Sequence, residues 1–88
     1  MVEATVTIRN AAGLHTRPAA MLVKLTSKFK SDIYLIRNGF TINAKSIIGV
    51  MTLAAEQGSQ LILRIEGRDE KQALHDIVNF FESGFGEL

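Results

Sequence analysis

The sequence predicts an α+β fold, a two-layer open-faced sandwich in which a four-stranded antiparallel sheet carries three helices on one face. Two kinds of apolar periodicity support this prediction. Strand-like segments alternate every second residue, and helix-like segments place apolar residues three or four apart. These segments follow one another in the order βαββαβα, without an internal repeat or a linker. With 88 residues the chain supplies one small core, so residues 1–88 are expected to form a single domain.

The first strand and the first helix are predicted from these two periods. The strand ends near Arg9, and its apolar positions alternate with polar ones at Val2, Ala4, Val6 and Ile8. A helix is expected from about Thr16 to Ser27, because Pro18 suits a first helical turn. The apolar side of this helix gathers Ala19, Leu22, Val23 and Thr26.

A hairpin and a short helix are predicted next. Two short strands, Asp32–Arg37 and Phe40–Asn43, are separated by Asn38-Gly39, the residue pair that a type I′ turn prefers. Ser46 then stands where an N-cap is needed for a helix from Ile47 to about Leu53.

The last strand and the last helix complete the pattern. Gly58 precedes a strand over Gln60–Glu66, whose buried face is expected to hold Leu61, Leu63 and Ile65. Asp69 is predicted to cap the final helix, with Gln72 as its capping-box partner, and Gly84 is predicted to end it. The apolar stripe of this helix comprises Ala73, Leu74, Ile77, Val78 and Phe81.

Composition excludes several classes of function. The chain has no cysteine, which removes disulfides and cysteine-bound metals, and its net charge of +1 provides no broad field for nucleic acid. Residues 1–8 alternate like a strand and lack the basic start and apolar run of a signal peptide. No segment approaches the length of a membrane span. We therefore expect a soluble cytoplasmic protein that does not insert into membranes, with function confined to a local site.

An imidazole and a guanidinium stand together at the start of the first predicted helix, within Gly13–Ala20. Backbone N–H groups of a first helical turn lack partners within the helix, and the helix dipole adds partial positive charge there. Arg17 offers forked donors suited to phosphate oxygens, and His15 offers a nucleophilic nitrogen. The arrangement indicates an anion site suited to carrying a phosphoryl group. Spacing alone, however, favours an ordinary loop histidine beside a helix start.

The segment GLHTRPAA, residues 13–20, resembles the phosphorylation-site sequence of HPr. HPr is the histidine-containing phosphocarrier family of the phosphoenolpyruvate-dependent sugar phosphotransferase system. The resemblance continues through Asn43–Leu53, reaches Gly67–Glu70 and spans nearly the whole chain. It implies a sheet whose strands lie in the spatial order 1-4-2-3.

The resemblance also implies roles for two residues. His15 would receive a phosphoryl group on Nδ1 from phosphorylated Enzyme I and pass it to a sugar-specific IIA domain, with Arg17 holding the phosphate. A protein of this kind is a stoichiometric carrier and not an enzyme. We expect it to need no cofactor and no metal, and to be a monomer.

Ser46 carries a second expectation from the resemblance. Family members with a similar Lys-Ser-Ile stretch are commonly phosphorylated on this serine by HPr kinase/phosphorylase. The sequence alone favours a plain N-cap for this serine, and the two roles are compatible. A phosphoserine at Ser46 would place negative charge near His15 and discourage docking of an acidic partner.

Two apolar groups are expected to form a docking patch near His15, because a small core cannot bury all of them. The short helix is apolar on every side, and Met21 and Leu25 lie off the buried stripe of the first helix. The predicted partner-binding residues are Thr16, Ala20, Met21, Lys24, Ile47, Ile48, Met51 and Thr52. A basic rim that steers acidic partners is predicted from Arg17, Lys24, Lys28 and Lys45.

A nitrogen-related branch of the same family is the nearest alternative. The segments Asn10–Gly13 and Phe80–Phe85 resemble that branch, whereas the stretch around Ser46 favours the sugar branch. Ala12 also departs from many sugar-branch members, which place a polar side chain there that helps to bind the phosphoryl group.

A small RNA- or protein-binding α+β module is the alternative from another class, with Tyr34 and Phe40 as possible stacking residues. The near-neutral charge and the lack of an aromatic-rich strand motif argue against it, so we expect no nucleic-acid partner. His75 lies on the polar side of the last predicted helix and is interpreted as a solvated histidine.

Overall fold

A computed structural model describes residues 1–87 and has the predicted element order βαββαβα. A short 3-10 turn, η1, follows the last helix. The elements are β1 (Val2–Thr7), α1 (Thr16–Thr26), β2 (Asp32–Arg37), β3 (Phe40–Asn43), α2 (Ile47–Thr52), β4 (Gln60–Glu66), α3 (Glu70–Glu82) and η1 (Gly84–Gly86). The two helix ends predicted at Ser27 and Leu53 lie one residue beyond the observed ends, where these residues form the C-caps.

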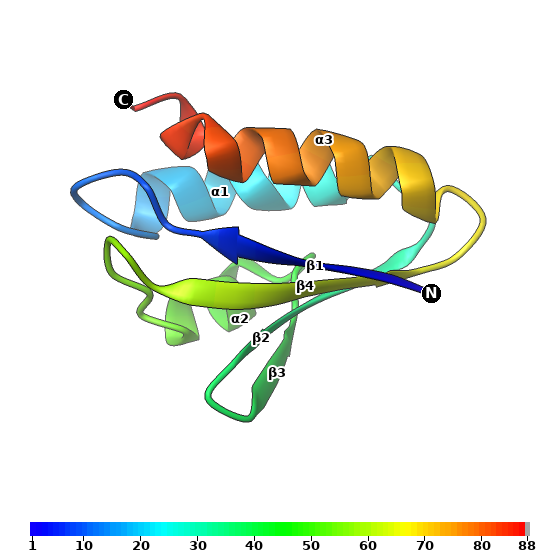
Figure 1. Ribbon diagram of the computed structural model, residues 1–88, viewed down its shortest axis with the longest axis horizontal. Helices are drawn as coiled ribbons and strands as arrows, with labels where there is room; N and C mark the ends of the chain where they lie inside the picture. Colours follow the sequence, from blue (N-terminus) through cyan, green and yellow to red (C-terminus); the bar gives the residue numbers. More distant parts are fainter. Residues whose placement is uncertain (88) are drawn as a thin grey trace.

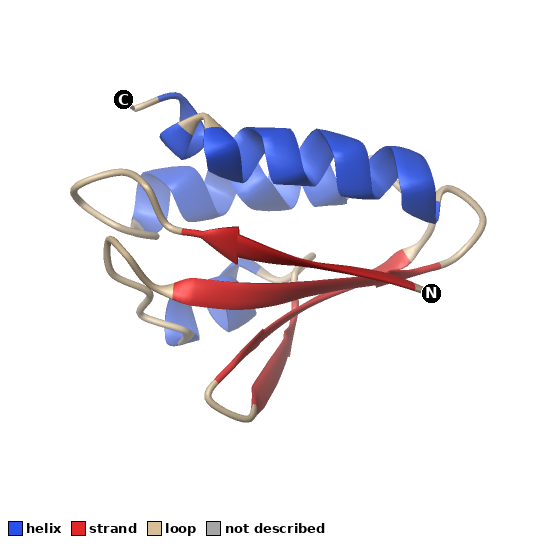
Figure 2. Ribbon diagram, viewed as in Figure 1, coloured by secondary structure: helices blue, strands red, loops and turns tan. Residues whose placement is uncertain are grey.

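The four strands form one antiparallel sheet in the order β1-β4-β2-β3, as the family resemblance implied. Helices α1 and α3 run side by side over one face of this sheet, and α2 contacts α1 and β3 (Figures 1 and 2). The opposite face is left open. The predicted α+β sandwich is therefore confirmed.

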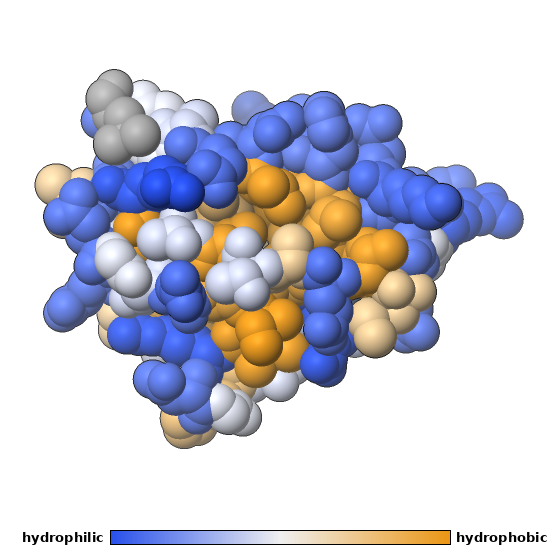
Figure 3. Space-filling view, in the orientation of Figure 1, coloured by the Kyte–Doolittle hydropathy of each residue, from blue (hydrophilic) through white to orange (hydrophobic). Residues whose placement is uncertain are grey.

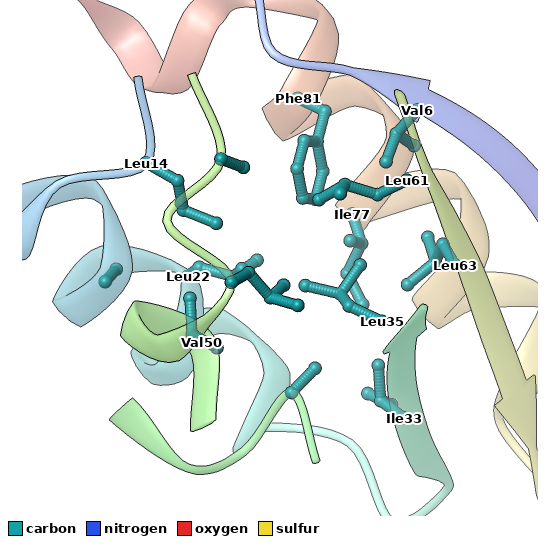
Figure 4. Close-up of a cluster of buried hydrophobic side chains, with 14 of the residues drawn as sticks. Val6, Leu14, Leu22, Ile33, Leu35, Val50, Leu61, Leu63, Ile77 and Phe81 are labelled. Carbon is teal, nitrogen blue, oxygen red and sulfur yellow. The ribbon is translucent and has the colours of Figure 1, made fainter. Parts of the chain in front are cut away.

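The core lies between the sheet and the helices. The predicted inner face of β4 is buried at Leu61, Leu63 and Ile65. Side chains from the loop before α1, from all three helices and from the sheet converge on one cluster (Figure 4). Burying each large aliphatic side chain of such a cluster contributes about 1.5–3 kcal/mol.

Apolar surface also reaches the outside of the molecule. In the space-filling view it gathers below α3 and over β1 and β4, bordered by hydrophilic side chains (Figure 3). Partly buried apolar residues pack against the core at Val2, Val23, Leu25, Phe29, Ile42, Leu74, Val78 and Phe80. Within residues 1–87 no helix is long and apolar enough to cross a bilayer.

The hairpin turn has the geometry that its sequence predicts. Asn38 and Gly39 both have positive φ angles, 50° and 82°, as a type I′ turn requires. The turn fixes the register in which Arg37 lies opposite Phe40.

The predicted capping box of α3 is wrong. Asp69 makes no side-chain cap, and Gln72 instead donates to the Asp76 carboxylate. The Asp69 carboxylate reaches the segment before β2, where it accepts hydrogen bonds from the backbone N–H groups of Lys30 and Ser31 and from the Ser31 hydroxyl. These donors, the Ser31 hydroxyl first, lower the pKa of Asp69 to about 2. Asp69 therefore joins two distant segments.

The end of α3 agrees with the prediction from Gly84. The helix ends at Glu82, and Gly84 has a φ angle of 63°, in the left-handed region where glycine avoids the strain of a side chain. The chain then turns back through η1 toward the loop that precedes α1 (Figure 1).

Candidate functional site

The loop before α1 is held in one conformation by buried contacts. The Asn10 side chain is buried, and its Nδ2 donates to the Gly13 carbonyl oxygen at 2.8 Å. Leu14 points into the core (Figure 4), and its N–H donates to the Ala55 carbonyl oxygen at 2.9 Å. Gly13 has a φ angle of 75°, and a Cβ there would lie 2.6 Å from that same oxygen. The loop therefore delivers the next residue in a fixed direction.

His15 is the N-cap residue of α1, but its side chain does not cap the helix. Its backbone is extended and its carbonyl oxygen accepts the first helical hydrogen bond, from Ala19 N–H at 3.0 Å. The imidazole is 41% exposed. The first-turn N–H groups of Thr16 and Arg17 are thus left without a side-chain cap, as an anion site requires.

Glu87 is the partner of His15 that the sequence interpretation missed. The two carboxylate oxygens lie 3.3 Å and 3.2 Å from His15 Nε2, and one of them also accepts from Asn10 Nδ2 at 2.8 Å. The hydrogen bond from Asn10, then that from His15, lowers the pKa of Glu87, and the Arg17 charge adds to this. Glu87 and His15 are 72 positions apart in the chain, and no periodic signal links them.

A buried phenylalanine anchors the segment that carries Glu87. Phe85 lies in the core with its ring centroid 5.1 Å from that of Phe81 and 5.3 Å from that of Phe80. Its φ angle of 59° is left-handed, and Gly84 and Gly86 flank it. An aromatic residue between two glycines just after a helix was the available sequence signal that the chain folds back there.

Arg17 is exposed on the first turn of α1. Among residues 1–87 it makes no hydrogen bond or ion pair, although its charge acts on Glu87. Its guanidinium is therefore available to an anion at the helix start.

Ser46 is the N-cap of α2, as predicted. Its Oγ accepts a hydrogen bond from the Gly49 N–H at 3.1 Å, and its carbonyl oxygen accepts one from Val50 N–H at 2.9 Å. A Cβ at Gly49 would lie 3.3 Å from the Asn43 carbonyl oxygen, so this turn is closely packed. The Ser46 side chain is half-buried.

The apolar side chains of α2 divide between the core and the surface, as the docking patch requires. Val50 and Leu53 are buried, whereas Ile48 is 74% exposed. Since α1 and α2 pack against each other, the predicted patch would span both helices. All eight predicted partner-binding residues are exposed: Thr16, Ala20, Met21, Lys24, Ile47, Ile48, Met51 and Thr52.

Two residues that were predicted to lie on the surface, Leu25 of the apolar pair and Lys45 of the basic rim, are partly buried. Leu25 is partly buried and packs against the core, so only Met21 of that pair is exposed. Lys45 is also partly buried, and its Nζ donates to the Phe29 carbonyl oxygen at 2.7 Å. The freely exposed basic side chains of the rim are therefore Arg17, Lys24 and Lys28.

The two aromatic residues considered for RNA stacking do not share a face of the sheet. Phe40 lies opposite Arg37, three positions after Tyr34 in β2, and successive side chains of a strand alternate between faces. Tyr34 therefore lies on the open face and Phe40 on the helix side. There a pocket of about 290 Å³ is lined by Arg37, Asn38, Phe40, Ile42, Thr52 and Leu53.

The remaining candidate residues are exposed. His75 is solvated, as predicted, with Nδ1 3.2 Å from the Asp76 carboxylate. Ala12 is also exposed and contributes no polar group. No three His, Cys, Asp or Glu side chains gather as metal ligands within residues 1–87.

Comparison with known proteins identifies the family. The family model described as "PTS HPr component phosphorylation site" matches residues 2–83. A phosphocarrier protein HPr of Treponema pallidum is 49% identical over 87 residues, which cover 99% of both chains. A crystal structure of HPr from Thermoanaerobacter tengcongensis has a TM-score of 0.96 and 45% identity, covering 100% of this chain and 99% of that one.

A second type of relative is also similar. The Bacillus subtilis catabolite repression HPr, Crh, is 38% identical in a crystal structure with a TM-score of 0.77. The alignment covers 96% of this chain and 97% of that one, and Crh forms a domain-swapped dimer in that crystal. The family match, the full-length identity and the shared fold agree with one another, and this chain belongs to the HPr phosphocarrier family of the phosphotransferase system.

Proposed function

We propose that this protein accepts a phosphoryl group on His15 from phosphorylated Enzyme I and donates it to sugar-specific IIA domains. The observation that carries the proposal is the exposed imidazole at the N-terminus of α1, where no side chain caps the helix, together with the exposed Arg17 on the first turn, which makes no ion pair among residues 1–87. In the proposed role the protein is a cytoplasmic monomer that needs no cofactor. The Ser46 segment supports the sugar branch of the family over the nitrogen-related branch.

The proposed chemistry is a reversible exchange of bonds to phosphorus. The Nδ1 lone pair of His15 forms a P–N bond while the bond between phosphorus and the donor breaks, and the donor keeps that electron pair. First-turn N–H groups of α1 and the Arg17 guanidinium are placed to hold the phosphoryl oxygens. Transfer to a IIA domain reverses these steps with a different partner.

Mutation of the acceptor tests this proposal directly. The protein would be incubated with phosphoenolpyruvate and Enzyme I, and acid-labile phosphate would be mapped by mass spectrometry. We expect His15→Ala to abolish uptake while its melting temperature stays close to wild type, because the ring is exposed and not part of the core.

His75→Ala is the matched control, since it removes the other imidazole of the chain from the surface of α3. This variant should take up phosphate like wild type. Normal uptake by His15→Ala would contradict the carrier proposal.

We also propose that phosphorylation of Ser46 by HPr kinase/phosphorylase reduces phosphoryl uptake at His15. Ser46 opens the helix that carries half of the docking patch, and its Oγ already occupies the position of a helix-capping acceptor. Phosphate oxygens are favourable at such a position, so the modification is expected to leave the fold intact. Phosphorylation of Ser46 would instead weaken the docking of partner proteins.

A further inference from the structure

The contact between His15 and Glu87 restricts which ring nitrogen carries the proton. An ionised carboxylate has no hydrogen to donate and can only accept. The pKa of Glu87 is lowered, chiefly by the hydrogen bond from Asn10, so this side chain is ionised at neutral pH. With both oxygens within 3.3 Å of Nε2, the proton of a neutral ring lies on Nε2 and the lone pair on Nδ1.

The Glu87 carboxylate is held in position from two sides. Asn10 is buried at 1% exposure and bridges the Gly13 carbonyl oxygen and the Glu87 carboxylate with its single amide nitrogen, both at 2.8 Å. On the other side, the Glu87 N–H donates to the Gly84 carbonyl oxygen at 3.0 Å, and buried Phe85 fixes the turn between them. The loop that presents His15 and the segment that presents its partner are thus joined through Asn10.

We infer that Glu87 is a positioning residue that selects the Nε2–H tautomer of His15 and so leaves Nδ1 free to attack phosphorus. The inference rests on the proposed phosphocarrier function and names a further residue of that same site. In the other tautomer Nδ1 carries the proton and cannot form the P–N bond. Once the bond has formed, the ring holds Nε2–H and a positive charge, which the carboxylate offsets.

The tautomer can be measured without any partner protein. We would record ¹⁵N chemical shifts of the His15 ring at about pH 8.5, where an ordinary imidazole is neutral. Glu87→Gln keeps the size of the side chain and an acceptor for Asn10, but its amide no longer selects the proton on Nε2. The Nδ1–H population should rise roughly twofold to fivefold, as expected for one exposed charge-assisted contact.

Glu82→Gln is the control, because Glu82 pairs with Arg9 near the same end of the molecule and does not contact His15. It should leave the His15 tautomer unchanged. An unchanged tautomer in Glu87→Gln would overturn the inference.

The kinetics of phosphoryl transfer distinguish a failure of this inference from a failure of the proposed function. With Enzyme I as donor, Glu87→Gln should lower kcat by a similar twofold to fivefold and leave KM unchanged, since a positioning residue acts on the attack and not on docking. A rise in KM alone would overturn the positioning role. If wild type takes up no phosphate, the carrier proposal fails, and the ring shifts still decide whether Glu87 selects the tautomer.

Discussion

The helices α1 and α2 both begin at an N-cap residue with an extended backbone, but the side chains of these two residues are used differently. His15 and Ser46 are both extended, and the carbonyl oxygen of each accepts the first helical hydrogen bond. Ser46 uses its side chain to cap its own helix, whereas the His15 ring turns away to Glu87. The N-terminus of a helix is therefore either capped or left open to a ligand, depending on whether the side chain of its N-cap residue bonds to the helix itself or to another group.

Among substitutions at these two helix starts, removal of the Arg17 cation at the start of α1 should slow phosphoryl transfer the most. We expect Arg17→Ala to slow transfer to and from His15 by roughly 10-fold to 100-fold, the range for loss of a charge-assisted hydrogen bond. Some activity should remain, because the backbone N–H groups of α1 still face the site. Rapid-quench rates with Enzyme I in both directions would measure this.

Arg68→Ala removes the same charge from the loop between β4 and α3 and serves as the control. Equal rates in Arg17→Ala and wild type would show that the guanidinium does not hold the phosphoryl group.

A negative charge at the capped start of α2 should slow phosphoryl transfer less. We expect Ser46→Asp to slow phosphorylation by Enzyme I roughly threefold to tenfold at low salt, because the carboxylate repels an acidic partner beside the docking patch. Stability should be unchanged or raised, since negative charge at a helix N-terminus contributes about 0.3–1 kcal/mol. Initial rates across a salt series, with thermal melts, would test both points.

Ser46→Asn is the matched variant, because asparagine caps as well as serine does and carries no charge. If Ser46→Asn slows transfer as much as Ser46→Asp does, the effect comes from the shape of the cap and not from its charge.

The start of α3 gives a third, purely structural case. Hydrogen bonds from Ser31 and Lys30 lower the folded-state pKa of Asp69 from 3.8 to about 2. This carboxylate therefore stabilises the fold above its unfolded-state pKa, and the stabilisation is lost as pH falls from about 4 toward 2. The difference in unfolding free energy between wild type and Asp69→Asn should shrink over this window.

Asp76→Asn is the control, because it removes one negative charge from a partly exposed carboxylate of the same helix that contacts Gln72 and His75. A constant gap between wild type and Asp69→Asn from pH 7 to 2 would mean that the carboxylate does not titrate as proposed.

Local sequence patterns predicted most of the fold, because regular helices, strands and turns depend on residues that are close together in the chain. The bounds of β2 and β3 follow from two residues, Asn38 and Gly39, whose positive φ angles fix the hairpin. The buried face of β4 and the cap at Ser46 depend on neighbours within a few positions. The strand order 1-4-2-3 came from the family resemblance and not from periodicity.

The contacts that local patterns missed join residues far apart in the chain. Asp69 has the residue type and position of an N-cap, but donors on Lys30 and Ser31, 38 or more residues away, compete for its carboxylate. Glu87 meets His15 only because Phe85 folds back into the core. The family resemblance predicted His15 as the nucleophile, whereas tertiary packing decides which carboxylate lies beside it.

The six residues of α2 are too few to form a stable helix by themselves, since isolated helices below about 12 residues are marginal in water. The helix is held by Val50, buried on its inner side, and by Leu53 at its C-cap. Ile48 and Met51 occupy neighbouring positions on its outer side. If α2 forms part of the docking surface as proposed, core packing and partner recognition are constrained together, and a substitution under α2 would change what the protein binds without altering any surface residue.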